Sequence, residues 1–280
     1  MQVAANYRPG VVFIGMETSG AMRRRFQAAG FETYSCDVLP AEDGGEEMAY
    51  SADGLPLGRH IVGDVFETLD SLWASDLWPS FAVFHPSCTY LTISAAWAFN
   101  DPDFERYPGV GYHQRVKPGT LTGEARRFAR EAALADVRRI MALPIRRKVI
   151  ENPVGAIGTR IRKASQVVQP YQFGDDASKA TCLWFVDKDG NEAPECALPI
   201  DPAKRCPGRL VQVSNPGSGG DAAPGYDTVE RWSNQCDNGQ NRLTPGDDRW
   251  KERSRTFPGL ADAAVAHWST LVDAPPRRLL

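Results

Sequence analysis

Two side chains in this sequence have the chemistry for covalent and acid–base catalysis, and each follows a short buried run. Cys88 comes soon after Phe81–Phe84, and Glu151 comes directly after Lys148–Ile150. A cysteine attacks as its thiolate, which forms readily when nearby cations or a following helix N-terminus lower the thiol pKa. A glutamate at a buried strand end can have its pKa raised by desolvation, so that it acts as an acid. The two groups suit a reaction in which a thiolate adds to a substrate while a carboxyl group supplies a proton.

Three further runs end in residues that suit ligand binding. Val11–Gly15 leads into a glycine-bounded segment that closes at Gly20, Glu32–Cys36 ends at Asp37, and a third run, 60–62, ends at Asp64. Each residue taken alone could be a simple turn former. In an open parallel sheet, however, ligands bind beyond the carboxyl ends of the strands. Five strand ends that carry useful groups therefore predict a single crevice.

The elements that must position these groups alternate between strands and helices. Such alternation predicts an α/β fold with a doubly wound, mostly parallel sheet. Residues 100–120 contain too many prolines and glycines for regular structure, so we expect a loop there that could act as a lid. Further strands are expected at 166–169 and 181–186, and helices at 20–29, from Cys88 through Trp97, at 122–143 with Phe128 on its apolar face, and at 259–272.

The chain of 280 residues is long enough for one catalytic domain with an appended lobe. Residues 187–250 are rich in glycine, proline, asparagine and aspartate and have little periodicity. We therefore expect a catalytic domain formed by residues 8–186 and 251–280, and a small irregular lobe formed by residues 187–250.

Composition bounds the setting of the protein. The sequence has no long apolar run and its first residues lack the regions of a signal peptide, so we expect a cytoplasmic monomer without a membrane segment. The six cysteines form no paired framework, which favours reduced thiols. A zinc site built from cysteines 182, 196, 206 and 236 is an alternative, but it lacks a Cys-x-x-Cys pair, and no metal is expected. The net charge of −3 does not by itself indicate nucleic-acid binding.

The order of these segments resembles the motifs of the DNA cytosine-5 methyltransferases, most closely a compact branch that is common in phage genomes. Phe13–Gly20 looks like the first cofactor motif, and Gly63–Val65 is similar to the Gly-Asp-Ile motif beside the adenine. His85–Thr89 resembles the Pro-Cys-Gln nucleophile motif with a serine inserted before the cysteine. Glu151–Pro153 resembles Glu-Asn-Val, and Arg253–Gly259 resembles the motif that closes the cofactor pocket. In order and context these short motifs are more specific than any one of them alone.

The resemblance implies a Rossmann-like methyltransferase fold, S-adenosylmethionine as the methyl donor and cytosine in double-stranded DNA as the substrate. Cys88 would add to carbon 6 of the ring, and Glu151 would bond ring nitrogen 3. The base must leave the duplex, because its ring faces are otherwise stacked. A phage origin implies that the protein works in the cytoplasm of the bacterial host. The residues implied for the cofactor are Phe13, Gly15, Glu17, Ser19, Gly20, Asp37, Val38, Asp64, Val65, Pro86, Ser254 and Thr256.

One motif of the family, Gln-x-Arg-x-Arg, has no counterpart here. Ser178–Thr181 and Thr159–Arg162 are the two candidates to replace it. We prefer Lys179 and Thr181 as catalytic residues, since the family carries this motif on the strand before the recognition lobe. The basic residues expected to contact DNA phosphates are Arg160, Arg162, Lys163, Arg249, Lys251 and Arg253.

Three other readings remain open at the level of the sequence. A relative that binds DNA without catalysis would keep the basic residues. A hydrolase could pair Cys88 with His85 or His267, although Cys-His signatures are specific to their families. A nicotinamide dehydrogenase is disfavoured, because Phe13–Gly20 is not a Gly-x-Gly-x-x-Gly fingerprint.

Overall fold

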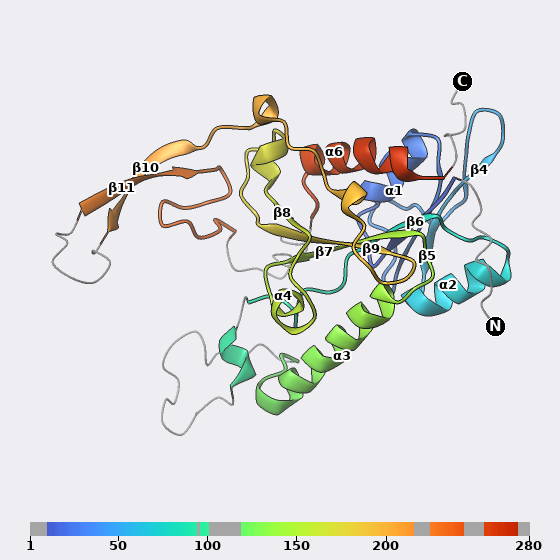
Figure 1. Cartoon of the computed structure of the whole chain (residues 1–280), viewed down its shortest axis with the longest axis horizontal. Coiled ribbons are helices and arrows are strands. Elements are labelled where there is room, and N and C mark those ends of the chain that lie inside the picture. The colour runs from blue at the N-terminus through green and yellow to red at the C-terminus, as the bar shows by residue number, and fades with distance from the viewer. Residues whose placement is uncertain (1–9, 94–95, 101–118, 216–224, 244–254, 274–280) are drawn as a thin grey trace.

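The computed structural model describes residues 10–93, 96–100, 119–215, 225–243 and 255–273. At its centre is a seven-stranded sheet in the order β5-β2-β1-β6-β7-β9-β8 (Figure 1). The neighbouring strands pair in parallel except at β9, which is antiparallel to β7 and to β8. The strands of this sheet are β1 Val11–Gly15, β2 Glu32–Asp37, β5 His60–Val62, β6 Phe81–Phe84, β7 Arg147–Pro153, β8 Gln166–Val168 and β9 Thr181–Asp187.

Helices cover both faces of the sheet, with α1 and α6 on one side and α2 and α3 on the other (Figure 1). The α-helices are α1 Ala21–Ala28, α2 Val65–Ala74, α3 Gly123–Met141, α4 Ala156–Arg160 and α6 Pro258–Trp268. Short 3-10 helices are η1 Ala96–Phe99, η3 Pro170–Phe173, η4 Pro194–Cys196, η5 Pro202–Lys204 and η6 Ser269–Leu271. Two hairpins stand apart from the main sheet, namely β3 Ala49–Tyr50 with β4 Pro56–Gly58, and β10 Arg209–Asn215 with β11 Gly225–Arg231.

Strand β1 shows why the sheet is covered on both sides. Its residues are all buried, and successive side chains point to opposite faces. Val11 and Phe13 belong to the core beneath α2 and α3, whereas Val12 and Ile14 belong to the core beneath α1 and α6. An uninterrupted apolar run is typical of such a doubly covered strand. The predicted doubly wound, mostly parallel α/β sheet is confirmed.

The helix predicted directly after Cys88 is wrong. The amides of Leu91 and Thr92 both bond the Cys88 carbonyl, which makes a single turn, and only the short helix η1 follows. Thr92 instead forms a β-bridge with Gly155. Pairing with the segment after β7 therefore competes successfully with helix continuation, so Cys88 has no helix N-terminus behind it.

Helix α3 corrects the expectation for Phe128, whose side chain is 77% exposed. The buried side of this helix carries Arg126, Leu134, Val137 and Ile140. A helix turns about 100° per residue, so Phe128 points almost directly away from Arg126 and Val137. The stripe of the helix that faces the core therefore begins with a buried arginine rather than with the phenylalanine.

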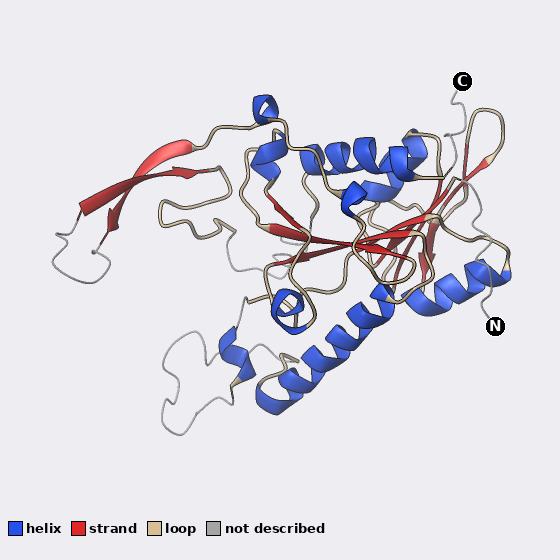
Figure 2. Ribbon diagram, viewed as in Figure 1, coloured by secondary structure: helices blue, strands red, loops and turns tan. Residues whose placement is uncertain are grey.

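The lobe predicted to be irregular contains a regular hairpin, β10–β11, which projects from the body of the protein (Figure 2). Its strands are largely exposed, with Leu210 and Tyr226 at 73% and 76%. A ribbon without a buried face lacks the alternation that reveals strands in a sequence, which explains the error. Before the hairpin, Ala193, Cys196 and Leu198 still pack in the core beneath α1 and α6.

The cysteines behave as reduced thiols, since no disulfide joins any of the six, and all of them lie in the described part of the chain. Cys182 and Cys196 belong to the cores on opposite faces of the sheet, which removes the four-cysteine zinc alternative. None of the helices in the described ranges has both the length and the apolar character needed to cross a bilayer.

Candidate active site

The strand order reverses between β1 and β6, because the chain proceeds to β2 and β5 on one side and to β7 on the other. Such a switch point opens a crevice at the carboxyl ends of the strands. The two strand ends are joined there by a hydrogen bond from the His85 amide to the Gly15 carbonyl, 2.9 Å. A Cβ atom at Gly15 would lie 2.5 Å from the Phe84 ring, so close packing at this point requires glycine.

The loop after β1 points the carboxylate of Glu17 into the interior of the protein. Met16 has a left-handed backbone, with φ 62°, and its amide donates to the Cys36 carbonyl over 2.6 Å. This turn buries Glu17, whose Oε1 accepts hydrogen bonds from the Met22 amide, 2.8 Å, and from the Ser19 hydroxyl, 3.1 Å. Oε2 of Glu17 is also buried but has no hydrogen-bond partner among the described residues. A buried carboxylate oxygen of this kind fits a donor from a ligand or from water.

Two more carboxylates stand at the ends of the next strands. Asp37 accepts from the Leu39 amide over 3.0 Å, and its carbonyl accepts from the Gly63 amide over 2.9 Å. Asp64 caps α2 by accepting from the amides of Phe66 and Glu67. The predicted cofactor positions 37 and 64 are thus neighbours on one edge of the crevice.

The remaining expected cofactor residues differ in exposure. Val38 is 70% exposed next to Asp37, whereas Phe13 and Val65 are buried in the core. Phe13 packs on Phe84 with ring centroids 5.8 Å apart, so it supports the floor of the loop. Thr256 is partly buried just before α6, and Ser254 lies outside the described residues.

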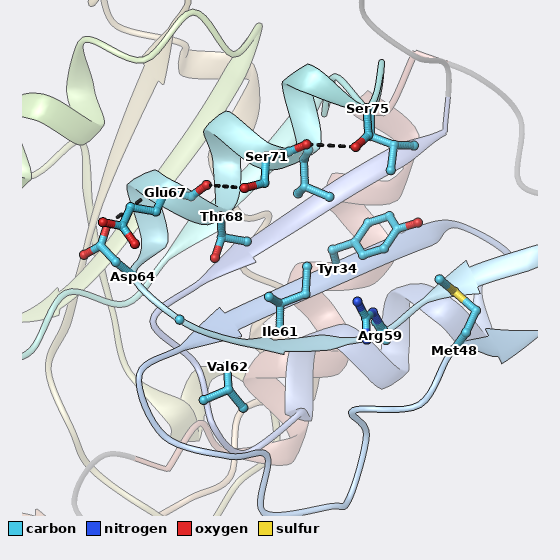
Figure 3. Close-up of a pocket in the computed structure, with 13 residues that line it drawn as sticks. Tyr34, Met48, Arg59, Ile61, Val62, Asp64, Glu67, Thr68, Ser71 and Ser75 are labelled. Atoms are coloured by element: carbon cyan, nitrogen blue, oxygen red, sulfur yellow. Dashed lines mark hydrogen bonds between the residues drawn. The ribbon is translucent and has the colours of Figure 1, made fainter.

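A depression of about 470 Å³ lies beside β5 and α2 (Figure 3). Among its lining residues are Tyr34, Arg59, Asp64 and Ser71. Asp64 is the only residue that it shares with the expected cofactor set. The depression is therefore distinct from the crevice at β1, β6 and β7, where the reactive side chains converge.

The turn that carries Cys88 is held from β7. The Asn152 amide nitrogen donates to the Pro86 carbonyl over 2.6 Å, and the Ala156 amide donates to the Leu91 carbonyl, also over 2.6 Å. Cys88 itself is partly exposed between these two anchors. Asn152 therefore positions the backbone two residues before the thiol.

Arginines of α3 hold the same turn from the other side. Arg126 is buried and donates to the Thr89 carbonyl over 2.9 Å, while Arg130 donates to the Tyr90 carbonyl over 3.3 Å. The Arg126 guanidinium also lies over the ring of Tyr90, 5.3 Å from its centroid. These guanidiniums hold the two carbonyls that follow Cys88 in the turn. The sequence signal was weak, because arginines on an amphipathic helix usually face solvent.

Glu151 and His85 form a hydrogen-bonded pair, with 3.1 Å between Oε2 and Nδ1. Burial alone would raise the pKa of Glu151, but the His85 hydrogen bond and the Lys179 charge lower it overall. Burial alone would lower the pKa of His85, but the Glu151 hydrogen bond and the charges of Glu151 and Glu17 raise it. The expectation that the pKa of Glu151 is raised is therefore wrong, because the His85 hydrogen bond and the Lys179 and His85 charges together outweigh desolvation.

Lys179 lies near this pair, because its positive charge lowers the pKa of both Glu151 and His85. Its Nζ donates to the Arg255 carbonyl over 3.3 Å. Thr181 is buried, and its hydroxyl donates to the Lys179 carbonyl over 3.1 Å. Of the two residues preferred as replacements for the missing motif, Lys179 is near the acid–base pair and Thr181 supports its backbone.

The expected DNA-contacting residues fall into three groups. Arg162 donates to the carbonyls of Phe185 and Gly190, so its guanidinium is bound within the fold. Arg160 and Lys163 are exposed, with Arg160 3.6 Å from a Glu131 carboxylate oxygen. The residues that lie outside the described ranges are Arg249, Lys251 and Arg253.

The β10–β11 hairpin is fastened close to Lys179. Asn234 accepts from the Ser178 amide over 3.0 Å and donates to the Ser178 carbonyl over 2.9 Å. Trp232 stacks on Tyr171 with ring centroids 3.9 Å apart. The base of the hairpin is thus bonded to the residue that precedes Lys179 in the chain.

A scan against models of known protein families finds no match to this chain, and a comparison with curated protein sequences finds none either.

Proposed function

We propose that this protein is a DNA cytosine-5 methyltransferase that uses S-adenosylmethionine and attacks its target base with Cys88. The observation that carries the proposal is the convergence of Cys88, Glu151 and Lys179 at the switch point of the sheet, beside the loop that contains Glu17. A nucleophile, an acid–base group and a cation at one crevice are the parts that such a reaction needs.

The sheet supports this proposal over the dehydrogenase alternative. A dinucleotide-binding sheet places its sixth strand next to its fifth, whereas here the antiparallel β9 lies between β7 and β8. The loop after β1 also turns the Glu17 carboxylate inward toward the start of α1. A pyrophosphate is poorly suited to a loop that already holds a buried carboxylate there.

The residues of the crevice fit S-adenosylmethionine. Oε2 of Glu17 is a buried acceptor that suits the ammonium group of the cofactor, and Asp37 offers a carboxylate to the ribose hydroxyls. Gly63 is partly buried and Asp64 caps α2, and on this proposal the two residues would contact the adenine ring. When bound, this cofactor supplies a methyl group on a positively charged sulfur, which is an electrophile for carbon.

Several side chains would each have a separate role in the reaction of the cytosine ring. Carbon 5 of cytosine is a poor nucleophile, so Cys88 first adds its thiolate to carbon 6 and makes carbon 5 electron-rich. Glu151 bonds ring nitrogen 3, where electron density arrives as sulfur adds. Lys179 supplies a positive charge that lowers the pKa of the Glu151 carboxyl group. Asn152, Arg126 and Arg130 keep the Cys88 turn in place.

The projecting hairpin supports a DNA substrate. The major groove of B-DNA admits a two-stranded β-ribbon, and β10–β11 is such a ribbon with exposed side chains on both strands. Its base is bonded to Ser178, next to Lys179. Contact of the ribbon with duplex DNA would therefore bring the crevice to a flipped base.

The hydrolase alternative is weaker on the same geometry. A hydrolase would need a histidine ring nitrogen to take the proton of the Cys88 thiol. Nδ1 of His85 bonds Glu151, and Nε2 is buried without a hydrogen-bond partner in the described part of the chain. His267 bonds the Glu195 carbonyl on the far side of α6.

The test uses duplex DNA that carries 5-fluorocytosine, together with S-adenosylmethionine. Fluorine prevents the elimination that frees Cys88, so wild-type protein should form a covalent complex that survives denaturation. Cys88→Ala should form none and should lose methyl transfer to ordinary DNA. Cys206→Ala is the matched control, because its thiol is also partly exposed, and it should behave as wild type. Methylation of DNA by Cys88→Ala at the wild-type rate would contradict the proposal.

A further inference from the structure

His85 connects two carboxylates that come from different parts of the chain. Its Nδ1 lies 3.1 Å from Oε2 of Glu151 on β7. Its amide is bonded to Gly15, at the start of the loop that buries Glu17. Glu17 and Glu151 both act on His85 electrostatically, and Lys179 opposes them. These are the charged groups that face the imidazole from the elements packed around it.

Two atoms in this arrangement are buried without a hydrogen bond. They are Nε2 of His85 and Oε2 of Glu17, both within the described residues. A buried polar atom without a partner costs free energy, and in native proteins such atoms usually mark a functional requirement. A histidine that served only to fill a turn would have no need of a second carboxylate beside it.

We propose that His85 and Glu151 form one proton-holding unit, in which His85 supplies the proton that Glu151 delivers to nitrogen 3 of the target cytosine. This inference rests on the proposed function. His85 acts through Glu151 and is therefore a positioning residue that also stores a proton. The geometry that carries it is the 3.1 Å contact together with the buried, unpaired Nε2 and the nearby Glu17.

The proton balance of the step is as follows. The bond between the Cys88 sulfur and carbon 6 forms, the ring double bond between carbons 5 and 6 is lost, and an electron pair reaches nitrogen 3. The His85 imidazolium gives its proton to the Glu151 carboxylate, which delivers a proton to nitrogen 3, so the pair is left as a neutral imidazole and a carboxylate. After methylation of carbon 5, a water molecule takes the hydrogen of carbon 5 as a proton and the electron pair of that bond re-forms the double bond between carbons 5 and 6. The bond from carbon 6 to sulfur then breaks, and Cys88 leaves as the thiolate. The proton on nitrogen 3 then returns to the unit.

The unit explains how an ionised glutamate can still serve as an acid. The pKa of Glu151 is lowered and that of His85 is raised, so the shared proton rests on the imidazole rather than on the carboxylate. The negative charges of Glu17 and Glu151 stabilise the positively charged imidazolium of His85, so the proton stays in the site and is not lost to solvent. Coupled groups of this kind titrate as a pair rather than singly.

The experiment measures single-turnover methylation of duplex DNA against pH for wild type, His85→Asn and His85→Gln. Asparagine keeps a hydrogen-bond donor near the position of Nδ1 but cannot titrate. It should therefore keep the hydrogen bond to Glu151 without being able to store a proton. We expect His85→Asn to be slower by about tenfold or more, because a positioned acid contributes on the order of a hundredfold. As the pH rises, the activity of His85→Asn should also begin to decline at a lower pH than that of wild type, since Glu151 alone must then hold the proton. His267→Gln, on α6, should leave the profile unchanged.

A second measurement does not depend on turnover. Nuclear magnetic resonance titration of the imidazoles in wild type and Glu151→Gln should show a His85 pKa above 6.5 that falls in the variant. Wild-type rates and an unchanged pH profile in His85→Asn would overturn the inference while leaving the proposed function intact. So would a His85 resonance that is indifferent to Glu151→Gln. Absence of methyl transfer by wild-type protein would overturn the proposed function, and the inference with it.

Discussion

A carboxyl group at the end of a buried strand is expected to keep its proton, and at Glu151 two neighbours, His85 and Lys179, reverse this. The hydrogen bond from His85, together with the charges of Lys179 and His85, stabilises the carboxylate more than burial destabilises it. The same contact raises the pKa of His85 in spite of its burial. The protonation states of both residues therefore depend on the pair, and removal of either partner changes the other.

The pair predicts a pH dependence of stability. A raised pKa means that His85 stabilises the folded state fully below about pH 6.5, with loss as the pH rises through its folded pKa. A lowered pKa means that Glu151 contributes fully above about pH 4.5, with loss as the pH falls through its folded pKa. The loss of unfolding free energy in His85→Gln should thus be largest at about pH 5.5 and smaller at about pH 8. Urea unfolding at both pH values measures it, and equal losses would show that the two groups are not coupled.

Substitutions at the carboxylates of Glu151 and Asp64 should have different effects, one on turnover and the other on cofactor affinity. Glu151→Gln keeps the size of the side chain but cannot give up a proton, so we expect single-turnover methylation to fall by roughly a hundredfold or more with little change in DNA affinity. Asp64→Asn keeps the cap of α2, because asparagine caps as well as aspartate. It should raise KM for S-adenosylmethionine and leave the rate at saturating cofactor nearly normal. If Glu151→Gln behaves in the same way as Asp64→Asn, Glu151 belongs to the scaffold.

At the scale of elements, the Cys88 turn is clamped between β7 and α3. The segment after β7 approaches so closely that a Cβ atom at Gly155 would lie 1.8 Å from the Leu91 carbonyl oxygen. Arg126 and Arg130 bind the next carbonyls along the turn. The nucleophile is therefore positioned by contacts from two elements rather than by a helix of its own.

This clamp can be tested with two glycines three residues apart. Gly155→Ala should push the Cys88 turn away from β7, lower the unfolding free energy by about 1–3 kcal/mol and reduce methylation. Gly158→Ala on α4 meets nothing within 4 Å, so it should be neutral or stabilise by about 0.5–1 kcal/mol. Thermal unfolding and single-turnover assays on both variants distinguish them. Equal behaviour of the two would mean that the close approach at Gly155 has no consequence.

At the scale of the whole molecule, the sheet carries the crevice and the hairpin extends away from it (Figure 1). Trp232 at the base of the hairpin stacks on Tyr171 and donates to the Cys206 carbonyl over 3.0 Å. Few side chains of the strands beyond this base are buried. The hairpin is thus a separable part whose removal should leave the sheet intact.

Shortening the hairpin tests its role. A variant that lacks residues 211–229, with Leu210 joined to Glu230 by Asn-Gly, keeps the base of the ladder and closes it with a tight turn. It should retain a thermal shift with S-adenosylhomocysteine, because the cofactor residues lie on the sheet. Affinity for duplex DNA should fall, whereas its dependence on salt should change little, because the removed segment contains no lysine or arginine. Unchanged DNA affinity would assign DNA binding to another surface.

The sequence by itself determined the sheet and the residues at its strand ends. Apolar runs as short as Val11–Gly15 identify strands buried on both faces, and the residues after them must lie at one edge of a parallel sheet. Cys88 and Glu151 could be singled out in this way because strand ends follow from local pattern and topology. Whether these residues act as proposed is left to the experiments above.

Only the tertiary structure decided how these residues are surrounded. The antiparallel direction of β9, the Arg126 contacts and the Asn152 anchor all join segments far apart in the chain, and such pairings leave no local pattern. The direction of the Glu151 pKa shift was wrong in prediction for the same reason. Desolvation follows from a buried strand, which the sequence reveals, but the opposing hydrogen bond comes from His85, 66 positions away, and depends on the two strand ends meeting.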